Sequence, residues 1–384
     1  MKDLNVHTKP SNLLAKGITV LSLSLALQSR SCASDSGTLN YTLKHTSDTQ
    51  FLQEIENRKD ISGPDETGHN WLYAAVSCDM PQKVALVLKR IDNDIISGFK
   101  YKDADFPNTY DKVSKKTALG IAIEKGYTAI VKLLANNKHI DINKAKIGST
   151  SLLEALFNNK KKEIAKILLN HPNIDIRTKD PTLGSPLHLA IEQKFQDIAL
   201  LLINKLPEED LKTKNKKGET PLHLAIEHNL EDVVKLLINK LSTVEDLCRK
   251  DIKERTPLHM AVRGNHKNAF NMLFKQIDHL CNDKRASIGK LFDKDTKGRS
   301  VFARTYLPKY TTQGWIYISK DNADMFKHVL ETVQNNLNAG HWEAITNEIN
   351  SLEHKGTIKK RDADTLRGIV HACASGSSAA SESV

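Results

Sequence analysis

The stretch GETPLHLAIEHNLEDVVKLLINK, residues 218–240, has a close copy upstream, GSPLHLAIEQKFQDIALLLINK, residues 184–205. Thirteen of 21 positions are identical when the two are aligned from Ser185 and Thr220. The leucine of the shared PLH motif stands at Leu187 and Leu222 and returns 36 residues later at Leu258. Self-similarity at such a period is typical of proteins built from repeated supersecondary units.

Weaker copies of the same motif precede these three. They are centred on Leu152, in TSLLEA, on Leu119, in TALGIA, and on Leu72, in HNWLYAA. The first two lie 35 and 33 residues before their successors, and the third lies 47 residues before Leu119 because of a polar and aromatic insertion. The sequence therefore predicts six clear units.

Each unit predicts a pair of helices. Thr or Ser stands where it can cap the first helix, and Pro follows in the first turn of the strongest copies. Gly126, Asn229 and Asn265 mark the turn between helices, where a left-handed residue is needed, whereas Lys194 at the matching place should be mildly strained. The second helix carries aliphatic residues at helical spacing. Such a pair has apolar faces on both sides and buries them only by stacking on neighbouring copies, so we predict an all-α solenoid.

A unit of about 33 residues reading T-P-L-H-x-A, with two antiparallel helices and a β-turn finger, resembles the ankyrin repeat. The resemblance implies burial of the PLH leucines. It also implies that the adjacent histidines bond to backbone and tie one finger to the next. Because equivalent positions in a stack lie one repeat apart, these histidines are too far from one another to share a zinc ion. The residues of this structural pattern are Leu187, His188, Leu222, His223, Leu258 and His259.

The pattern and the composition divide the chain into segments. We expect a signal peptide at 1–33, a linker or N-terminal cap at 34–65, the repeat stack at 66–334, a helical C-terminal cap at 335–372 and a disordered tail at 373–384. The stack includes a degenerate seventh unit that is interrupted by an insertion at 303–320. In the C-terminal cap, Trp342, Ile345, Ile349 and Leu352 have helical spacing.

The N-terminus has the features of an export signal. Lys9 and Lys16 precede an apolar run at 17–27, which is too short to span a bilayer, and small residues follow around Cys32. Cleavage after Ala33 is one outcome. The other is lipidation of Cys32, which resembles a bacterial lipoprotein, although Arg30 departs from that pattern. We expect an exported protein, whether secreted, periplasmic or lipid-anchored; the alternative is a cytoplasmic protein whose first helix is amphipathic.

The segments before the PLH motifs form the finger tips, and they are rich in lysine in a chain of net charge +10. Tips one repeat apart would line one edge of the stack and favour another protein, with an acidic surface, as the partner. Asp251, Glu254, Asp293 and Asp295 dilute the charge and no aromatic residues alternate with the lysines, which argues against nucleic acid. The candidate partner-binding residues are Lys214, Lys216, Lys217, Arg249, Lys250, Lys253, Lys294 and Lys297.

No motif indicates catalysis. The sequence has no glycine-rich phosphate loop, no GxSxG elbow and no HExxH, and its five cysteines are scattered. We therefore expect no catalytic residue, no metal and no cofactor. The leading hypothesis is a non-enzymatic protein–protein interaction scaffold, similar to the exported ankyrin-repeat proteins with which host-associated bacteria engage host proteins.

Two alternatives stay open. The first is a binder of anionic surfaces, nucleic acid or membrane, through the lysine-rich fingers. The second is an enzyme in the region 300–372, which would need a pocket built from the aromatic and histidine residues there: Tyr306, Trp315, Tyr317, His328 and Trp342.

Overall fold

The structure, a computed structural model, describes residues 43–64, 69–157, 161–281, 284–302, 320–355 and 358–375. The expected signal peptide, Cys32, the insertion at 303–319 and the tail from residue 376 lie outside these ranges. The chain forms two compact units, Met1–Ser151 and Leu152–Val384, and the division falls inside the segment expected to be one stack. Each unit is described by itself.

The described part of the first unit holds an N-terminal helix, two helix pairs and a short two-stranded finger. The finger strands are antiparallel. Its elements are α3 (Asp48–Asn57), α4 (Trp71–Ser77), α5 (Pro81–Ile96), α6 (Ala118–Lys125), α7 (Thr128–Asn136), β1 (Lys144–Lys146) and β2 (Ser149–Thr150).

The second unit is helical in its described part, and its first helix begins at the boundary residue. The elements are α8 (Ser151–Leu156), α9 (Lys162–Leu169), α10 (Pro186–Glu192), α11 (Gln196–Lys205), α12 (Glu208–Leu211), α13 (Pro221–Glu227), α14 (Glu231–Lys240), α15 (Val244–Leu247), α16 (Pro257–Gly264), α17 (Lys267–Leu280), α18 (Lys284–Gly289), α20 (Lys320–Val333), η2 (Gln334–Asn336), α21 (Ala339–His354) and α22 (Lys360–Ser375).

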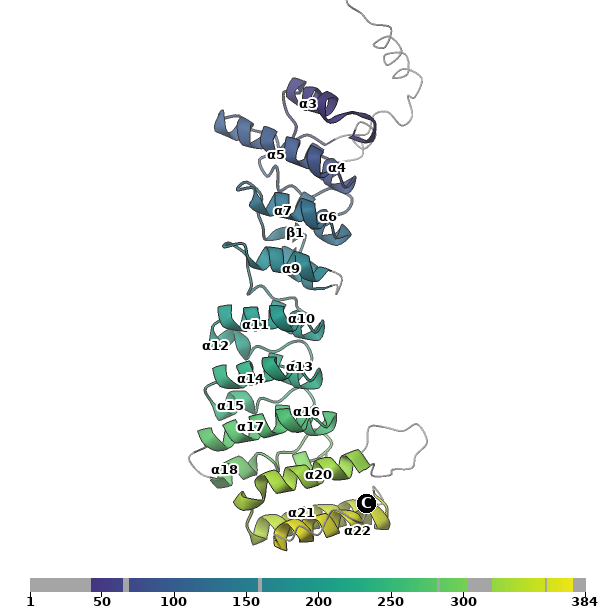
Figure 1. Cartoon of the computed structure of the whole chain (residues 1–384), viewed down its shortest axis with the longest axis vertical. Helices are drawn as coiled ribbons and strands as arrows, with labels where there is room; N and C mark the ends of the chain where they lie inside the picture. The colour runs from purple at the N-terminus through teal and green to yellow at the C-terminus, as the bar shows by residue number, and fades with distance from the viewer. Residues whose placement is uncertain are drawn as a thin grey trace, which may run out of the picture. The chain divides into compact units, whose positions relative to one another are not determined.

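In the second unit the helix pairs stack in two rows (Figure 1). The first helices α10, α13 and α16 contact one another in sequence, and the second helices α11, α14 and α17 do the same. Leu187 and Leu222 are fully buried and Leu258 is 1% exposed, because each sits where a first helix meets its neighbours. The expected burial of the PLH leucines is confirmed, and so is the all-α solenoid.

The turns between paired helices use the left-handed conformation that the sequence predicts. Gly126, Lys194, Asn229 and Asn265 all have positive φ, between 54° and 81°. At Lys194 the φ of 58° places a lysine in the left-handed region, which glycine and asparagine adopt more readily. This agrees with the mild strain expected at this position. Asp79 adopts the same conformation, with a φ of 55°, in the first pair.

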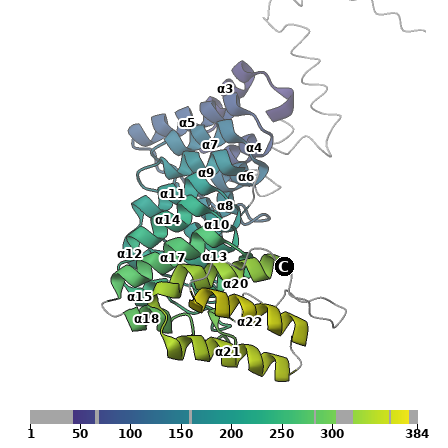
Figure 2. The same cartoon turned by 60° about the horizontal axis from the view of Figure 1, so that its bottom comes forward.

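Three long helices close the C-terminal end of the second unit (Figure 2). Helix α20 contacts α17 and α22, and α22 packs along α21. Ile345 and Ile349 of α21 are fully buried. A terminal repeat must hide a face that has no neighbour, and this helical cap does so. Helix α22 continues to Ser375, so residues 373–375, which we expected to be disordered, are helical.

In the first unit α3 lies against α5 and covers the first helix pair. Its Phe51 and Ile55 are fully buried, and Phe51 lies beside Trp71 with ring centroids 5.6 Å apart. Lys83 is buried too, and its ammonium group donates to the carbonyl oxygens of Leu43 and Thr46. These contacts satisfy a charge that would otherwise be costly to bury.

Gly120 allows the second pair to approach the following finger. It occupies the place of His188 in its unit, and a Cβ there would collide with the carbonyl oxygen of Ala145. The same carbonyl accepts the backbone N–H of Thr117 at 2.8 Å, and the Thr117 hydroxyl donates to the Lys144 carbonyl at 2.7 Å. A backbone contact thus replaces the histidine link in this repeat.

Gly120→Ala should therefore destabilise the first unit. Because the added methyl group meets backbone rather than a flexible side chain, the strand must move, at a cost of about 1–3 kcal/mol or more. Urea unfolding followed by circular dichroism would measure the loss. Gly63→Ala is the matched control, since a Cβ there meets nothing within 4 Å. Equal unfolding midpoints for the two variants would contradict the close approach.

Candidate functional site

Three buried histidines join successive fingers of the second unit. The Nε2 atom of His188 lies 3.2 Å from the carbonyl oxygen of Glu219, and that of His223 lies 3.0 Å from the carbonyl of Arg255. His259 repeats the contact with the Arg299 carbonyl at 3.2 Å. Each carbonyl belongs to the finger of the next repeat, so these contacts tie one finger to the next.

The same geometry fixes the protonation of these rings. The backbone N–H of Ser185 points at Nδ1 of His188 at 3.2 Å, and that of Thr220 points at Nδ1 of His223 at 3.2 Å. Because a backbone N–H only donates, Nδ1 accepts, and the ring proton sits on Nε2, where it bonds to the finger carbonyl. Burial lowers the pKa of His188 and of His223 to about 4, so both rings are neutral at pH 7.

The fingers themselves are turns closed by an Asp or Asn side chain. We define finger 4 as residues 180–184, finger 5 as 215–219, finger 6 as 251–255 and finger 7 as 295–299. In finger 6, Oδ1 of Asp251 accepts the backbone N–H groups of Lys253 and Arg255, both at 2.8 Å. Asn215 and Asp295 do the same in fingers 5 and 7.

This geometry corrects the sequence interpretation of two acidic residues. Asp251 and Asp295 were expected to dilute the charge of the finger tips, but both are buried and hold their turns together. Asp251 also forms an ion pair with Arg255, which lies 3.6 Å from the buried carboxylate of Glu219 in the preceding finger. A signal was present in the sequence, because Asx side chains commonly close such turns.

Backbone hydrogen bonds connect neighbouring tips. The N–H of Ile252 in finger 6 donates to the Lys217 carbonyl of finger 5 at 3.1 Å, and the N–H of Thr296 in finger 7 donates to the Lys253 carbonyl at 3.0 Å. Fingers 5, 6 and 7 therefore form one continuous edge.

The eight basic residues predicted to bind a partner lie on this edge or beside it, and several of them contact other groups of the protein. Lys214 donates to the Lys250 carbonyl at 2.7 Å, and Arg249 pairs with buried Asp246 at 2.7 Å. The Lys250 ammonium group lies 3.4 Å from Glu254. The exposed remainder of the set is Lys216, Lys217, Lys253, Lys294 and Lys297.

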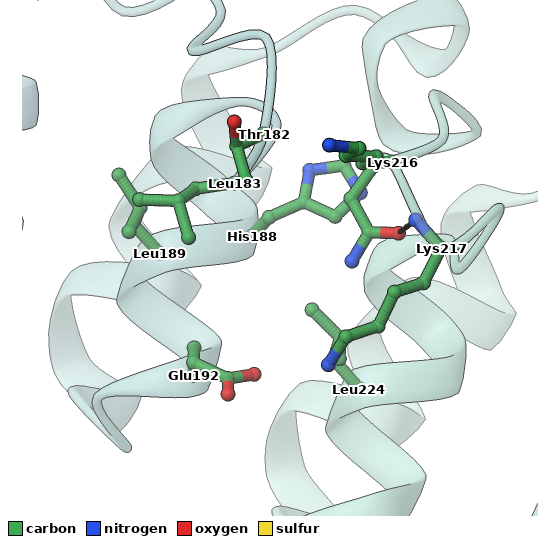
Figure 3. Close-up of a pocket in the computed structure, with 9 residues that line it drawn as sticks. Thr182, Leu183, His188, Leu189, Glu192, Lys216, Lys217 and Leu224 are labelled. Carbon is green, nitrogen blue, oxygen red and sulfur yellow. Dashed lines mark hydrogen bonds between the residues drawn. The ribbon is translucent and has the colours of Figure 1, made fainter.

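A hollow opens between fingers 4 and 5 (Figure 3). Its volume is about 150 Å³. Leu183, Leu189 and Leu224 supply an apolar lining from finger 4, α10 and α13, and His188 lies between the two fingers at the back. Lys216 and Lys217 border it on the side of finger 5, and Glu192 borders it on the side of α10.

The described residues offer little to a chemical reaction. Burial raises the pKa of the Cys248 thiol to about 12, which disfavours a nucleophilic thiolate. His328 bonds to the side chain of Asn271 at 2.9 Å, while Tyr306, Trp315 and Tyr317 lie outside the described residues. Within the described ranges no group of three His, Cys, Asp or Glu is placed to hold a metal ion. Among the helices seen there, none is long and apolar enough to cross a bilayer.

A comparison with protein-family models agrees with this geometry. A family model described as ankyrin repeats in three copies matches residues 92–180 and 187–284. This chain has the ankyrin-repeat fold. Among solved structures, the ankyrin repeat domain of Bcl-3, a member of the IκB protein family, is similar over 68% of this chain and 100% of that one, with 18% identity and a TM-score of 0.46. A search of curated proteins finds no match.

The ankyrin repeats differ in how they bind the next finger. Three of them use the histidine link, but Tyr73 occupies the equivalent place in the first repeat and its hydroxyl donates to Ser114 of the following finger at 2.9 Å. Gly120 replaces the histidine in the second repeat. The fingers and first helices of the second unit are therefore held by specific bonds, and they offer a preorganised surface to a partner.

Proposed function

We propose that this protein is a non-enzymatic scaffold that binds another protein through its fingers and first helices, and that it is exported to act on a protein of a host. The observation that carries the binding role is the edge formed by fingers 5, 6 and 7. Its tips are joined by backbone hydrogen bonds while the side chains of Lys216, Lys217 and Lys253 remain exposed.

The rigidity of this edge supports the binding role. The finger carbonyls are tied to buried histidines and the turns are closed by Asx side chains. Because the fingers are already ordered, the scaffold loses little conformational entropy when a partner binds. Exposed lysines on the tips favour a partner surface that carries carboxylates. Ion pairs at this rim should raise the rate of association more than the final affinity.

Export is supported by the N-terminal sequence. Lys9 and Lys16 before the apolar run at 17–27 have the order of a signal peptide, and the small residues around Cys32 suit a cleavage or lipidation site. Mass spectrometry of the N-terminus of the mature protein tests this part. We expect a chain that starts at Ser34, or a lipid on Cys32; an intact Met1 on the functional protein would contradict export.

The binding surface is tested by site-specific photo-cross-linking. A benzophenone amino acid placed at Lys217, Glu192 or Thr182 should cross-link the partner in lysate from candidate host cells or bacteria. Placed at Lys235 or Lys240 on the exposed side of α14, it should give no partner adduct. Adducts from α14 alone would assign binding to the outer helices, and no adduct from any position would contradict the scaffold role.

A further inference from the structure

Finger 4 is built differently from the three fingers that follow it. In finger 5 the N–H of Gly218 closes the turn on the Asn215 carbonyl three residues earlier, at 2.9 Å. In finger 4 the N–H of Gly184 reaches back four residues, to the Asp180 carbonyl at 3.0 Å. Both fingers have five residues, but the bond that closes the turn of finger 4 spans one residue more. Pro181 stands at its first corner, where Lys216, Ile252 and Thr296 stand in the others.

This difference in the closing bond explains the hollow. Fingers 5, 6 and 7 are linked tip to tip by backbone bonds, yet between fingers 4 and 5, both fully described, no backbone hydrogen bond forms. A bond equivalent to that of Ile252 would run from the Lys216 N–H to the Thr182 carbonyl. Leu183 instead faces the space between the fingers, opposite Leu224 and beside Leu189.

The hollow suits an apolar side chain. Leu189 and Leu224 are each only 3% exposed, so they form a rigid floor that is already packed from below. Space of this order accepts a group the size of benzene in engineered apolar cavities. A leucine, isoleucine or phenylalanine side chain from a partner would fill it and cover the part of Leu183 that is still exposed.

The charges around the hollow are unequal on its two sides. Lys216 and Lys217 are exposed, and among the described residues neither ammonium group has a hydrogen-bond or ion-pair partner. The side chain of Lys217 extends beside Leu224 (Figure 3). Across the hollow, a carboxylate oxygen of Glu192 lies 3.3 Å from Nε2 of His228 in the next repeat, so the rim has two lysines and one carboxylate. The net charge at the rim is positive.

We propose that this hollow is a recognition site for a short acidic peptide segment of the partner, in which one aliphatic or aromatic side chain enters between fingers 4 and 5 and a neighbouring carboxylate pairs with Lys216 and Lys217. The inference deepens the proposed scaffold function and rests on it. The acidic residue lies on the finger 5 side of the inserted residue, because Glu192 would repel it on the other.

The test is a selection of short random peptides displayed on phage against the full chain. The tightest peptide is then synthesised with a fluorescent label, and its Kd is measured by fluorescence anisotropy. The variants are Lys216→Glu with Lys217→Glu, which reverses the rim charge, and Leu183→Asn, which removes apolar lining. The matched control is Lys235→Glu with Lys240→Glu, the same charge change on exposed residues of α14. Circular dichroism checks that each variant is folded.

We expect selected peptides to carry Asp or Glu next to an aliphatic or aromatic residue. The rim reversal should weaken binding at least about tenfold, because it replaces two attractions to the peptide carboxylate with like-charge repulsion, and the control should change it little. A peptide with lysine in place of its acidic residue should regain affinity for the reversed variant. If Leu183→Asn does not fold, the rim reversal and this charge exchange still test the proposed peptide site.

Three results would overturn the inference. The first is selected peptides that bind the rim-reversed variant as tightly as the parent chain, which would move the site while leaving the scaffold function intact. The second is that no peptide is selected but the chain binds vesicles of phosphatidylcholine with about one-quarter phosphatidylserine, and that this binding depends on Lys216 and Lys217. That result would indicate an anionic membrane as the ligand of the site. The third is binding in neither arm. Failure of the scaffold function itself would appear separately, as the absence of any cross-linked partner.

Discussion

Leu222→Ala should lower the free energy of unfolding by about 2–5 kcal/mol, the range for deleting a buried leucine side chain that leaves a cavity. Leu222 is fully buried in α13, which contacts α10 on one side, α16 on the other and α14 within its own repeat. Because each repeat of a solenoid is stabilised by its neighbours, the loss should spread to the repeats before and after it.

Thermal unfolding and hydrogen exchange measure the two parts of this prediction. The midpoint should fall, and amide protection should decrease in α10 and α16 as well as in α13. Lys217→Ala is the control, because its side chain is exposed and its ammonium group has no hydrogen-bond or ion-pair partner among the described residues. If the two variants melt at the same temperature, Leu222 is not a core residue and the helix pairs do not stack as described.

Acidification should destabilise the second unit between pH 6.5 and pH 4. Burial lowers the pKa of His188 and His223 to about 4 in the folded protein, from an ordinary value of 6.5. Between these values the unfolded chain binds protons that the folded chain does not, so stability falls as the pH is lowered. Each of the two histidines contributes up to about 3 kcal/mol of this loss, since one pKa unit corresponds to about 1.4 kcal/mol.

The pH range in which stability is lost distinguishes the contribution of the histidines from that of the carboxylates. Hydrogen bonds and ion pairs lower the pKa of Asp251 and of Asp246 from 3.8, so their contribution disappears only below that value. His223→Gln retains a donor and an acceptor but does not titrate, and it should flatten the dependence of stability on pH above pH 4. His279→Gln, at an exposed position of α17, should leave the slope unchanged. Urea unfolding at a series of pH values measures both; a slope that survives His223→Gln would show that other groups cause it.

Much of this fold could be predicted from the sequence because the repeat period indicates where the helix pairs lie and which of their residues are buried. The PLH leucines had to be buried once helix pairs stacked. Gly126, Asn229 and Asn265 in the turns between paired helices were expected to be left-handed, and they are. Lys194 shows that the position matters more than the residue, because its φ of 58° matches that of Asn265 within one degree. The link from each histidine to the next finger followed from the family resemblance rather than from the spacing.

The details of the binding edge could not be predicted, since they depend on which groups neighbouring repeats bring together. Lys214 and Arg249 are basic tip residues in the sequence, but one bonds to a carbonyl of the next finger and the other to buried Asp246. The closing bond of finger 4 spans one residue more than that of finger 5, but this changes no hydrophobic pattern, so the hollow beside it has no signature along the chain. The roles of Tyr73 and Gly120, which stand in place of histidine, could not be predicted either, because they depend on contacts with the following finger.

The most direct measurement of the central claim is the protonation of the three linking histidines by NMR. In a long-range proton–nitrogen correlation spectrum of the full chain near neutral pH, the account predicts that His188, His223 and His259 are neutral, carry the proton on Nε2 and have an unprotonated Nδ1. That pattern requires a capping N–H on one side of each ring and the carbonyl of the next finger on the other. Rings that carry the proton on Nδ1, or that average between both forms as exposed imidazoles do, would contradict the tie between repeats.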